Sequence, residues 1–267
     1  MKISQGTVIV TGANADHFAN LRVLIGSWLT HMRPLPLAVC DYGLTPKQVL
    51  ELRAIQGIQL LPQPCPIRHP WQGKSLVGKF LTAFSQPWDI MVWIDADALF
   101  NHPLPKLGPL LDGYDLLIDA HVQAVGEIVH DCNLAALNLR RDDAYFSAGW
   151  WIAGRRENFL QRYEQFCALV EGKGNLWECD AFVAAVYAEK LCIHTVCGSI
   201  WHSRGKTSLQ TCSVHNLKAS HAGHPIYVIH ANDAYTVRQS DQRRVFVRPE
   251  LAAIQDHYEG VYFTRPR

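Results

Sequence analysis

The sequence predicts an α/β fold with a mostly parallel central sheet flanked by helices. Short apolar runs rich in β-branched residues alternate along the chain with segments whose apolar residues recur at helical spacing. One of these runs, Ile90–Ile94, is apolar at every position, which is typical of a strand buried on both faces of a parallel sheet. The chain has 267 residues, of which 48% are hydrophobic, enough for the core of one large domain.

The N-terminal segment predicts a strand, a polar loop and a helix. Thr7–Thr11 is an apolar, β-branched run, and Gly12–His17 is expected to be a loop that ends in a helix cap. From Phe18 to Met32, apolar residues recur at helical spacing. A polar loop at the carboxyl end of a strand is where nucleotides bind in such folds, but the sequence has neither G-x-G-x-x-G nor G-x-x-x-x-G-K-[ST].

Two further strand–helix units follow. Thr45 is a typical helix cap, Pro46 suits the first helical position, and Gly57 ends a helix that extends to about residue 56. Right-handed crossovers would then bring the strands into one mostly parallel sheet. The expected elements are strands at 35–40, 58–61 and 90–94, a helix at 46–56, a Pro-rich loop at 62–73 and a helix at 74–84.

The second half of the chain is less regular. Residues 120–145 and 200–222 show no clear period and are expected to be loops, the first as an insertion over a functional site. There is no internal repeat and no linker, so residues 1–267 are expected to form one domain. The expected elements are strands at 114–119, 145–153, 191–196 and 225–230, and helices at 107–111, 157–170, 178–190 and 249–257.

Charge and composition exclude several classes of protein. The chain carries 25 basic and 24 acidic residues, a formal net charge of +1, so no overall field attracts nucleic acid or an anionic membrane. There is no run of about eighteen apolar residues and no signal-peptide core, which predicts a cytoplasmic protein. The eight cysteines contain no Cys-x-x-Cys pair, which predicts reduced thiols rather than a zinc site or a disulfide framework.

Two carboxylates follow the buried strand 90–94. Successive side chains on a strand alternate, so Asp95 and Asp97 lie on one side, about 7 Å apart, and closer if the strand bends. Ligands collect at the carboxyl ends of strands in α/β sheets, and two acids there repel each other unless a cation lies between them. The pair therefore predicts a divalent metal site, although acids at strand ends are also common as turn formers and helix caps.

Four pieces of the sequence, taken in order, resemble the retaining glycosyltransferases of family 8, which include glycogenin and bacterial lipopolysaccharide galactosyl- and glucosyltransferases. Val92–Leu99 looks like the family's hydrophobic Asp-Ala-Asp signature, and Phe146–Gly149 is similar to its Phe-Asn-Ala/Ser-Gly strand. Trp177–Ala181 is similar to its Asp-Gln-Asp/Gly segment, and Val228–His230 to its Val/Ile-His strand. The resemblance covers about residues 8–235 and implies a GT-A fold, a Rossmann-like domain that binds nucleotide-sugars.

By this resemblance, Asp95, Asp97 and His230 hold a divalent ion, and Asp95 also reaches the ribose. A mixed oxygen and nitrogen set favours Mn²⁺ over Mg²⁺, and such an ion neutralises a diphosphate leaving group as its bond to the sugar breaks. A histidine at a strand end is also common as a structural residue. Asp180 is expected to contact the donor sugar near its anomeric carbon, although an acid that opens a helix also stabilises the helix dipole.

Further donor contacts implied by the resemblance are spread over the chain. Some have a simpler explanation: Asp16 as a helix cap, Lys79 as a solvated helix residue and Gly149 as a packing residue. About residues 1–100 would bind the nucleotide, and about residues 101–267 the sugar and the acceptor. The implied nucleotide and donor contacts are Thr11, Asn14, Asp16, His17, Lys79, Asp95, Ser147, Ala148, Gly149 and Cys179.

Two positions depart from the family pattern. Cys179 stands where many members have Gln, at the reacting face. After His230, Ala-Asn-Asp-Ala replaces the usual Gly…Lys-Pro-Trp, so the family's diphosphate-binding lysine is absent unless Arg238, Arg243 or Arg244 takes its place.

The leading hypothesis is a metal-dependent transferase that moves a hexose from a UDP-sugar to a saccharide, lipid-linked saccharide or protein acceptor, with retention. Retention can proceed through a covalent Asp180 intermediate or by same-face attack. The main alternative is a protein that binds nucleotide-sugars without turnover. A haloacid-dehalogenase-like phosphatase is less favoured, because that family places Asp-x-Asp after its first strand, whereas three strand–helix units precede it here. A peripheral membrane contact and a homo-oligomer both stay open.

Overall fold

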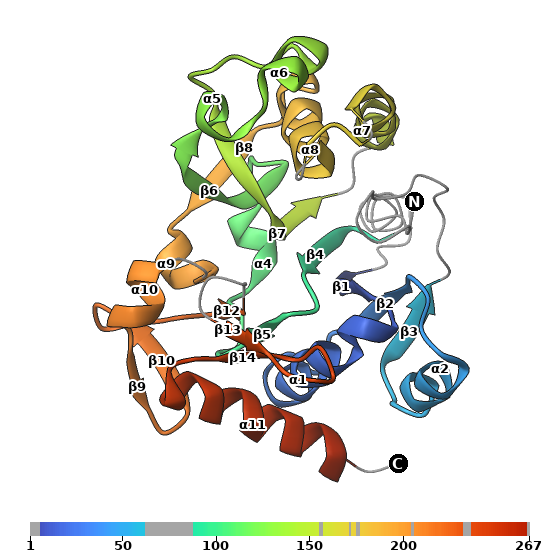
Figure 1. Ribbon diagram of the computed structural model, residues 1–267, viewed down its shortest axis with the longest axis vertical. Coiled ribbons are helices and arrows are strands. Elements are labelled where there is room, and N and C mark those ends of the chain that lie inside the picture. The colour runs from blue at the N-terminus through green and yellow to red at the C-terminus, as the bar shows by residue number, and fades with distance from the viewer. Residues whose placement is uncertain are drawn as a thin grey trace. The chain divides into compact units, whose positions relative to one another are not determined.

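Figure 1 shows the protein as a computed structural model, which describes residues 6–61, 88–154, 157–170, 172–174, 177–203, 206–231 and 236–265. The chain divides into two compact units, each built from several separate segments. The first contains residues 1–10, 61–93 and 108–196, and the second contains residues 11–60, 94–107 and 197–267. The loop expected at 62–73 and the helix expected at 74–84 lie outside the described residues.

A seven-stranded sheet confirms the predicted α/β class. Its strands are β1 (Thr7–Ala13), β2 (Leu37–Asp41), β3 (Ile58–Leu61), β4 (Ile90–Ile94), β6 (Leu116–Ala124), β7 (Ala144–Gly154) and β8 (Ile193–Val196). They lie in the order β3-β2-β1-β4-β7-β6-β8. Strands β1 and β4 pair in parallel, as β6 and β8 do, whereas β6 and β7 are antiparallel. The alternation of strand and helix patterns is what predicts such a sheet.

The best-predicted elements are those with long or unbroken patterns. Strands β3 and β4 have the predicted bounds, and β4 is buried at Met91, Val92, Trp93 and Ile94. Helix α7 (Glu157–Val170) also has the predicted bounds. The remaining predicted strands and helices within the described ranges are present with ends shifted, apart from the corrections below.

The predicted cap of the second helix is confirmed as a capping box. The Oγ1 atom of Thr45 accepts a hydrogen bond from the amide of Gln48 at 3.3 Å, and Oε1 of Gln48 accepts one from the amide of Thr45 at 2.8 Å. Helix α2 (Pro46–Arg53) ends earlier than the expected residue 56, because the chain already turns toward β3 through Gly57, whose φ of +91° suits glycine.

In the second unit, helices α1 (Phe18–His31) and α11 (Pro249–Thr264) lie side by side, blue and red in Figure 1. Gly26 of α1 permits this close approach, because a Cβ atom at that position would lie 1.8 Å from the carbonyl oxygen of Tyr258 in α11. At the end of α1, Nε2 of His31 lies 2.6 Å from the hydroxyl of Tyr258. The last helix is therefore tied to the first along its length, and it extends well beyond the predicted residues 249–257.

Short strands complete the second unit. Strand β12 pairs with β5, β13 pairs with β14, and β10 lies between β9 and β11. None of β5, β13 and β14 was expected from the sequence, and the strand expected at 225–230 is divided between β11 and β12. The bounds are Ala98–Phe100 (β5), Ser213–His215 (β9), Lys218–His221 (β10), His224–Pro225 (β11), Val228–His230 (β12), Thr236–Arg238 (β13) and Arg244–Phe246 (β14).

The first unit has an aromatic core. The indoles of Trp93 and Trp151 are stacked with ring centroids 6.2 Å apart, and Trp151 stacks on Phe182 at 6.0 Å. These residues link β4, β7 and helix α8 (Trp177–Ala188), which is buried over most of its length. The shorter helices of this unit are α4 (Leu107–Leu110), α5 (Val125–Ile128) and α6 (Asp131–Leu137).

Two expected loops were wrong. Residues 120–145 contain the end of β6, helices α5 and α6 and the start of β7. Residues 200–222 contain the end of helix α9 (Gly198–Trp201), helix α10 (Lys206–Thr211) and strands β9 and β10. The helices here have four to seven residues and β9 and β10 have three and four, too few to produce a clear period. Strand β6 is longer, but it has register shifts after Ile118 that interrupt its alternation. These segments are ordered by packing rather than by a sequence pattern.

The expected reduced thiols agree with the structure, since every cysteine within the described ranges is a free thiol. Within the same ranges, no helix is both long enough and apolar enough to cross a membrane.

Candidate metal centre

The acid pair lies in the turn between β4 and β5. Strand β4 ends at Ile94, and β5 begins at Ala98. The amide of Ala98 donates a hydrogen bond to the carbonyl of Asp95 at 3.0 Å, which closes the turn. Because the chain bends here, a carboxylate oxygen of Asp95 lies within 4.8 Å of one of Asp97, closer than the spacing of about 7 Å along an extended strand.

His230 reaches the acid pair because β12 pairs with β5. The pairing is antiparallel and sets His230 opposite Ala98. The amide of Ala231 donates to the carbonyl of Asp97 at 2.9 Å, which continues the ladder past the strand ends. On the other side, the amide of His230 donates to the carbonyl of Ser203 at 2.9 Å. Backbone pairing thus places an imidazole beside an acid that is 133 residues earlier in the sequence.

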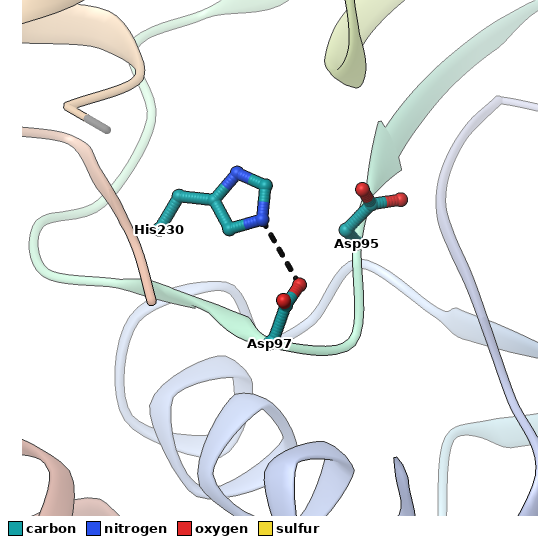
Figure 2. Close-up of side chains that lie close together, drawn as sticks. All are labelled: Asp95, Asp97 and His230. Atoms are coloured by element: carbon teal, nitrogen blue, oxygen red, sulfur yellow. Dashed lines mark hydrogen bonds and ion pairs between the residues drawn. The ribbon is translucent and has the colours of Figure 1, made fainter. Parts of the chain in front are cut away.

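The three predicted ligands converge, as Figure 2 shows. One ligand atom from each of Asp95, Asp97 and His230 lies within 4.8 Å of the other two, and Nε2 of His230 is 3.0 Å from Oδ1 of Asp97. Two ligands of one small divalent ion are at most about 4.2 Å apart, twice a metal–oxygen distance of about 2.1 Å. Small side-chain rotations would therefore fit the set to a divalent cation.

Asp97 lies in a strongly cationic environment. Its Oδ2 atom forms an ion pair with Nη1 of Arg244, and its Oδ1 atom faces His230. Burial opposes ionisation of this acid, but the charge and hydrogen bond of His230 and the charge of Arg244 outweigh it and hold the pKa of Asp97 well below its usual range. The surroundings of Asp97 therefore favour its ionised form.

Arg244 is aimed at Asp97 by its own backbone. Its amide donates to Oδ1 of Asn20 in α1 at 2.8 Å, and its carbonyl accepts from Nε2 of Gln255 in α11 at 2.9 Å. The same Gln255 accepts from the amide of Phe246 at 3.0 Å. The β13–β14 hairpin is thus clamped between two helices, and the guanidinium of Arg244 extends from a fixed base.

A second histidine lies behind the first. His202 is 0% exposed, and its Nε2 atom is 2.9 Å from Nδ1 of His230. The two rings are tilted by 31° with centroids 5.0 Å apart. The sequence predicted only that His202 belongs to the expected loop 200–222. Its contact with His230 was missed because it depends on the bridge between Ser203 and Ile229, for which no sequence signal exists.

The first β–α segment is only partly the expected loop. Strand β1 extends to Ala13, and a 3₁₀ helix follows at Ala15–His17. The cap of this turn is Asn14, whose Oδ1 accepts from the amide of His17 at 3.0 Å, while Asp16 is exposed and makes no cap. The side chain of Asn14 is therefore already engaged, so the cap expected near Asp16 lies two positions earlier.

Thr11 and His17, two of the residues expected to contact the nucleotide, lie in different surroundings. Thr11 is 0% exposed, and its Oγ1 atom has no hydrogen-bond partner among the described residues. His17 lies near the metal cluster: burial lowers its pKa, while the charge of Asp97 acts in the opposite direction. Whether either residue touches a nucleotide stays a prediction.

Asp180 lies in the first unit and is held rigidly there. It is in the first turn of α8 and 4% exposed. Its Oδ1 accepts from the hydroxyl of Tyr145 at 3.0 Å, and its Oδ2 accepts from Nδ2 of Asn133 at 3.1 Å. Burial raises the pKa of Asp180, although these two hydrogen bonds oppose the rise. The helix-dipole role and the donor-sugar role both stay compatible with this position.

The remaining residues that were expected to contact the donor lie in β7 and α8 or outside the described residues. Ala148 and Gly149 are buried in β7, which also contains Ser147. Cys179 follows Glu178 in α8 and is partly exposed. Lys79 lies outside the described residues. Their contacts with a donor stay predictions.

No protein-family model matches the chain, and no curated protein matches it. Solved structures do. The chain is similar to galactosyltransferase LgtC in complex with donor and acceptor sugar analogues, at 14% identity and a TM-score of 0.62, over 97% of both chains. It is similar to mouse xyloside xylosyltransferase 1, apo form, at 12% identity and a TM-score of 0.56, over 87% of this chain and 99% of that one.

A third match is the apo structure of the bifunctional glycosyltransferase WbbM, at 12% identity and a TM-score of 0.57. It covers 99% of this chain and 50% of that chain. Identities this low are evidence of fold, not of reaction. The chain has the GT-A fold that the four sequence pieces implied.

Proposed function

We propose that this chain is a metal-dependent glycosyltransferase that moves a hexose from a UDP-sugar to an acceptor with retention of the anomeric configuration. The observation that carries the proposal is the convergence of Asp95, Asp97 and His230 where a central strand ends. A shared fold does not by itself imply a shared reaction. The argument for the reaction comes from the three side chains, which together could hold the divalent cation that a nucleotide diphosphate leaving group needs.

The cofactor is proposed to be Mn²⁺, or Mg²⁺, held by Asp95, Asp97 and His230. When bound, such an ion neutralises the charge that develops on the diphosphate as its bond to the sugar breaks. Three protein ligands leave positions open for phosphate oxygens, because these ions take about six ligands. Asp95 is proposed to reach the ribose as well.

The side chains of the centre have distinct tasks in this proposal. Asp97 is ionised before any cation arrives, because its pKa is held low. His230 must present Nε2 without a proton, so its remaining proton belongs on Nδ1, which faces His202. The contact with His202 thus orients the ring of His230, and with a metal bound Nε2 of His202 would accept the proton of Nδ1.

Asp180 is proposed to contact the donor sugar. Hydrogen bonds from Tyr145 and Asn133 hold both of its oxygens, so the orientation of the carboxylate is set before a substrate binds. A buried, oriented carboxylate can serve a covalent route or stabilise an ion pair in same-face attack.

The wider setting of the reaction is also a proposal. The acceptor would be a saccharide, a lipid-linked saccharide or a protein, and the whole chain would act as one cytoplasmic domain. A peripheral membrane contact and a homo-oligomer remain part of this proposal.

The proposal is tested by titrating UDP into the purified protein by calorimetry, first with Mn²⁺ and then with EDTA. Binding should require the metal. The Asp97→Asn variant should lose more than about 100-fold in metal-dependent UDP affinity, since losing even a hydrogen-bond partner of a metal ligand costs about 10- to 100-fold. The matched control is Asp112→Asn, which removes an exposed acid outside the cluster and should bind UDP as the unchanged protein does.

A screen of UDP-sugars for donor hydrolysis separates the alternatives. Metal-dependent hydrolysis of one donor supports a transferase. Metal-dependent binding without hydrolysis of any donor supports a nucleotide-sugar-binding protein, and cleavage of simple phosphate esters supports a phosphatase. If UDP binds neither with Mn²⁺ nor with EDTA, the proposed function is wrong.

A further inference from the structure

The proposed metal site contains a positively charged side chain, the guanidinium of Arg244. Arg244 forms an ion pair with Oδ2 of Asp97, on the carboxylate that the proposed metal needs. The pair is shielded from water, with both side chains 15% exposed, so it is screened less than a surface pair. A divalent ion bound to Asp97 would lie close to this guanidinium, and the two like charges would repel.

The backbone of Arg244 is held in place, whereas its side chain is long and has several rotatable bonds. Contacts from Asn20 and Gln255 involve only the backbone of Arg244. The guanidinium can therefore leave Asp97 by rotation about side-chain bonds, without unfolding the β13–β14 hairpin. A nearby diphosphate would receive it well, because a guanidinium donates two parallel hydrogen bonds to phosphate oxygens.

The neighbouring arginines have other surroundings. Arg243 is buried and forms ion pairs with Asp256, at 2.7 Å, and with Glu259. Arg238 stands directly opposite Arg244 on the hairpin and is exposed. Arg244 therefore differs from Arg243 in that its guanidinium is ion-paired to Asp97, an acid of the proposed metal site.

We infer that Arg244 is an internal competitor for the cation, which neutralises Asp97 until metal and nucleoside diphosphate bind together and then moves to the diphosphate. The inference rests on the proposed function, and it makes metal and nucleotide binding mutually dependent. Metal alone binds weakly because it must displace Arg244. Metal with nucleotide binds well, because the diphosphate accepts the displaced charge, and by linkage each ligand raises the affinity for the other.

The test compares Arg244→Gln with a matched control, Arg53→Gln, which removes an exposed arginine at the end of α2. Two affinities are measured by calorimetry: Mn²⁺ alone, and UDP at saturating Mn²⁺. In Arg244→Gln, Mn²⁺ alone should bind more tightly and UDP more weakly, so the coupling between them falls by about 5- to 150-fold, the usual range of such coupling. Arg53→Gln removes an exposed charge that belongs to no proposed site and should change either affinity by less than about twofold, since exposed charges are well screened.

A third variant guards against a folding defect. Arg244→Lys keeps the positive charge but loses the two-pronged donor, so it should keep the weak binding of Mn²⁺ alone and still lose UDP affinity. The inference is overturned if the unchanged protein binds UDP with Mn²⁺ while Arg244→Gln, folded by circular dichroism, binds Mn²⁺ alone no more tightly. If the unchanged protein binds neither Mn²⁺ nor UDP, the proposed function itself fails and the inference falls with it.

Discussion

The imidazole rings of His202 and His230 share one hydrogen bond. Nε2 of His202 lies 2.9 Å from Nδ1 of His230, and only one of these atoms can donate when the other accepts. When Nε2 of His230 faces a cation, its Nδ1 carries the proton and His202 accepts it. Binding of a cation at Nε2 of His230 therefore requires Nε2 of His202 to act as the acceptor.

Replacement of His202 tests this arrangement. His202→Phe keeps a ring of similar size but removes the acceptor, so Mn²⁺ affinity in the presence of UDP should fall by about 10- to 100-fold. His202→Gln retains an amide oxygen as acceptor and should restore most of the affinity. Calorimetry with Mn²⁺ distinguishes the two, and equal affinities in both variants would mean that His202 only fills space.

At this scale, the sequence predicted the acids better than their partners. Asp95, Asp97 and His230 follow strand patterns in a recognisable order, and they converge as expected. The positions of His202 and Arg244 depend on short strands with no pattern of their own. Which of three arginines would face the acid pair could not be decided without the clamps on the β13–β14 hairpin.

At the scale of the element, the close packing of α1 against α11 depends on a glycine, Gly26, which has no side chain. Gly26→Ala would place a Cβ atom 1.8 Å from the carbonyl oxygen of Tyr258, so the helices must separate. The expected loss is about 1–3 kcal/mol of unfolding free energy, the usual cost of overpacking. Denaturation with urea, followed by circular dichroism, measures it.

The same substitution elsewhere in this pair of helices should act in the opposite direction. Gly260 lies in α11 and is exposed, and among the described residues no atom lies within 4 Å of the place that an alanine methyl group would take. Gly260→Ala should therefore raise the unfolding free energy by about 0.5–1 kcal/mol, because alanine is less flexible in the unfolded chain. A loss in both variants would show that helix packing is not the cause at Gly26.

Element prediction succeeded where burial leaves a long periodic or unbroken pattern and failed where it does not. Helix α7 has fourteen residues with one apolar stripe, and its bounds were predicted. Residues 200–222 were expected to be loop, yet Leu209 and Ala219 there are 2% and 0% exposed. Elements of three to six residues owe their structure to such isolated contacts, which appear only after the chain has folded.

At the scale of the whole molecule, acid should weaken the protein through a cluster around His31. Lys218 donates from Nζ to Nε2 of His31 at 2.7 Å, so that nitrogen must be unprotonated. Burial and then the charge of Lys218, with smaller effects of His102 and His257, lower the pKa of His31 from 6.5 to about 4. Lys218 also donates to the carbonyl of Asn101 at 2.9 Å, so the cluster joins α1, β10 and the end of β5.

The sign of the pH effect follows from linkage. Above about pH 6.5, His31 is neutral in both states, but between about pH 6.5 and pH 4 the unfolded chain binds a proton that the folded protein does not. Stability should therefore fall as the pH falls through this window. Thermal unfolding at pH 7 and pH 5 should show a smaller drop for His31→Gln, which cannot titrate; equal drops would exclude His31 as a cause.

All members of the metal cluster, with Arg244 and its clamps, belong to the second unit, whereas Asp180 belongs to the first. The α/β class of the whole chain was predictable, because strand and helix patterns alternate over its first half. That residues 1–267 form one domain stays a prediction, and each of the two compact units joins segments that are far apart in the sequence.

The pairing of β5 with β12 also sets an order of events during synthesis. Asp97 leaves the ribosome 133 residues before His230, a delay of about 7–27 s at about 5–20 residues per second. During that time the nascent chain exposes two carboxylates that lack both their third ligand and their arginine. The three proposed ligands therefore cannot meet until β12 has paired with β5, so the proposed site is completed only after the late strands have been made.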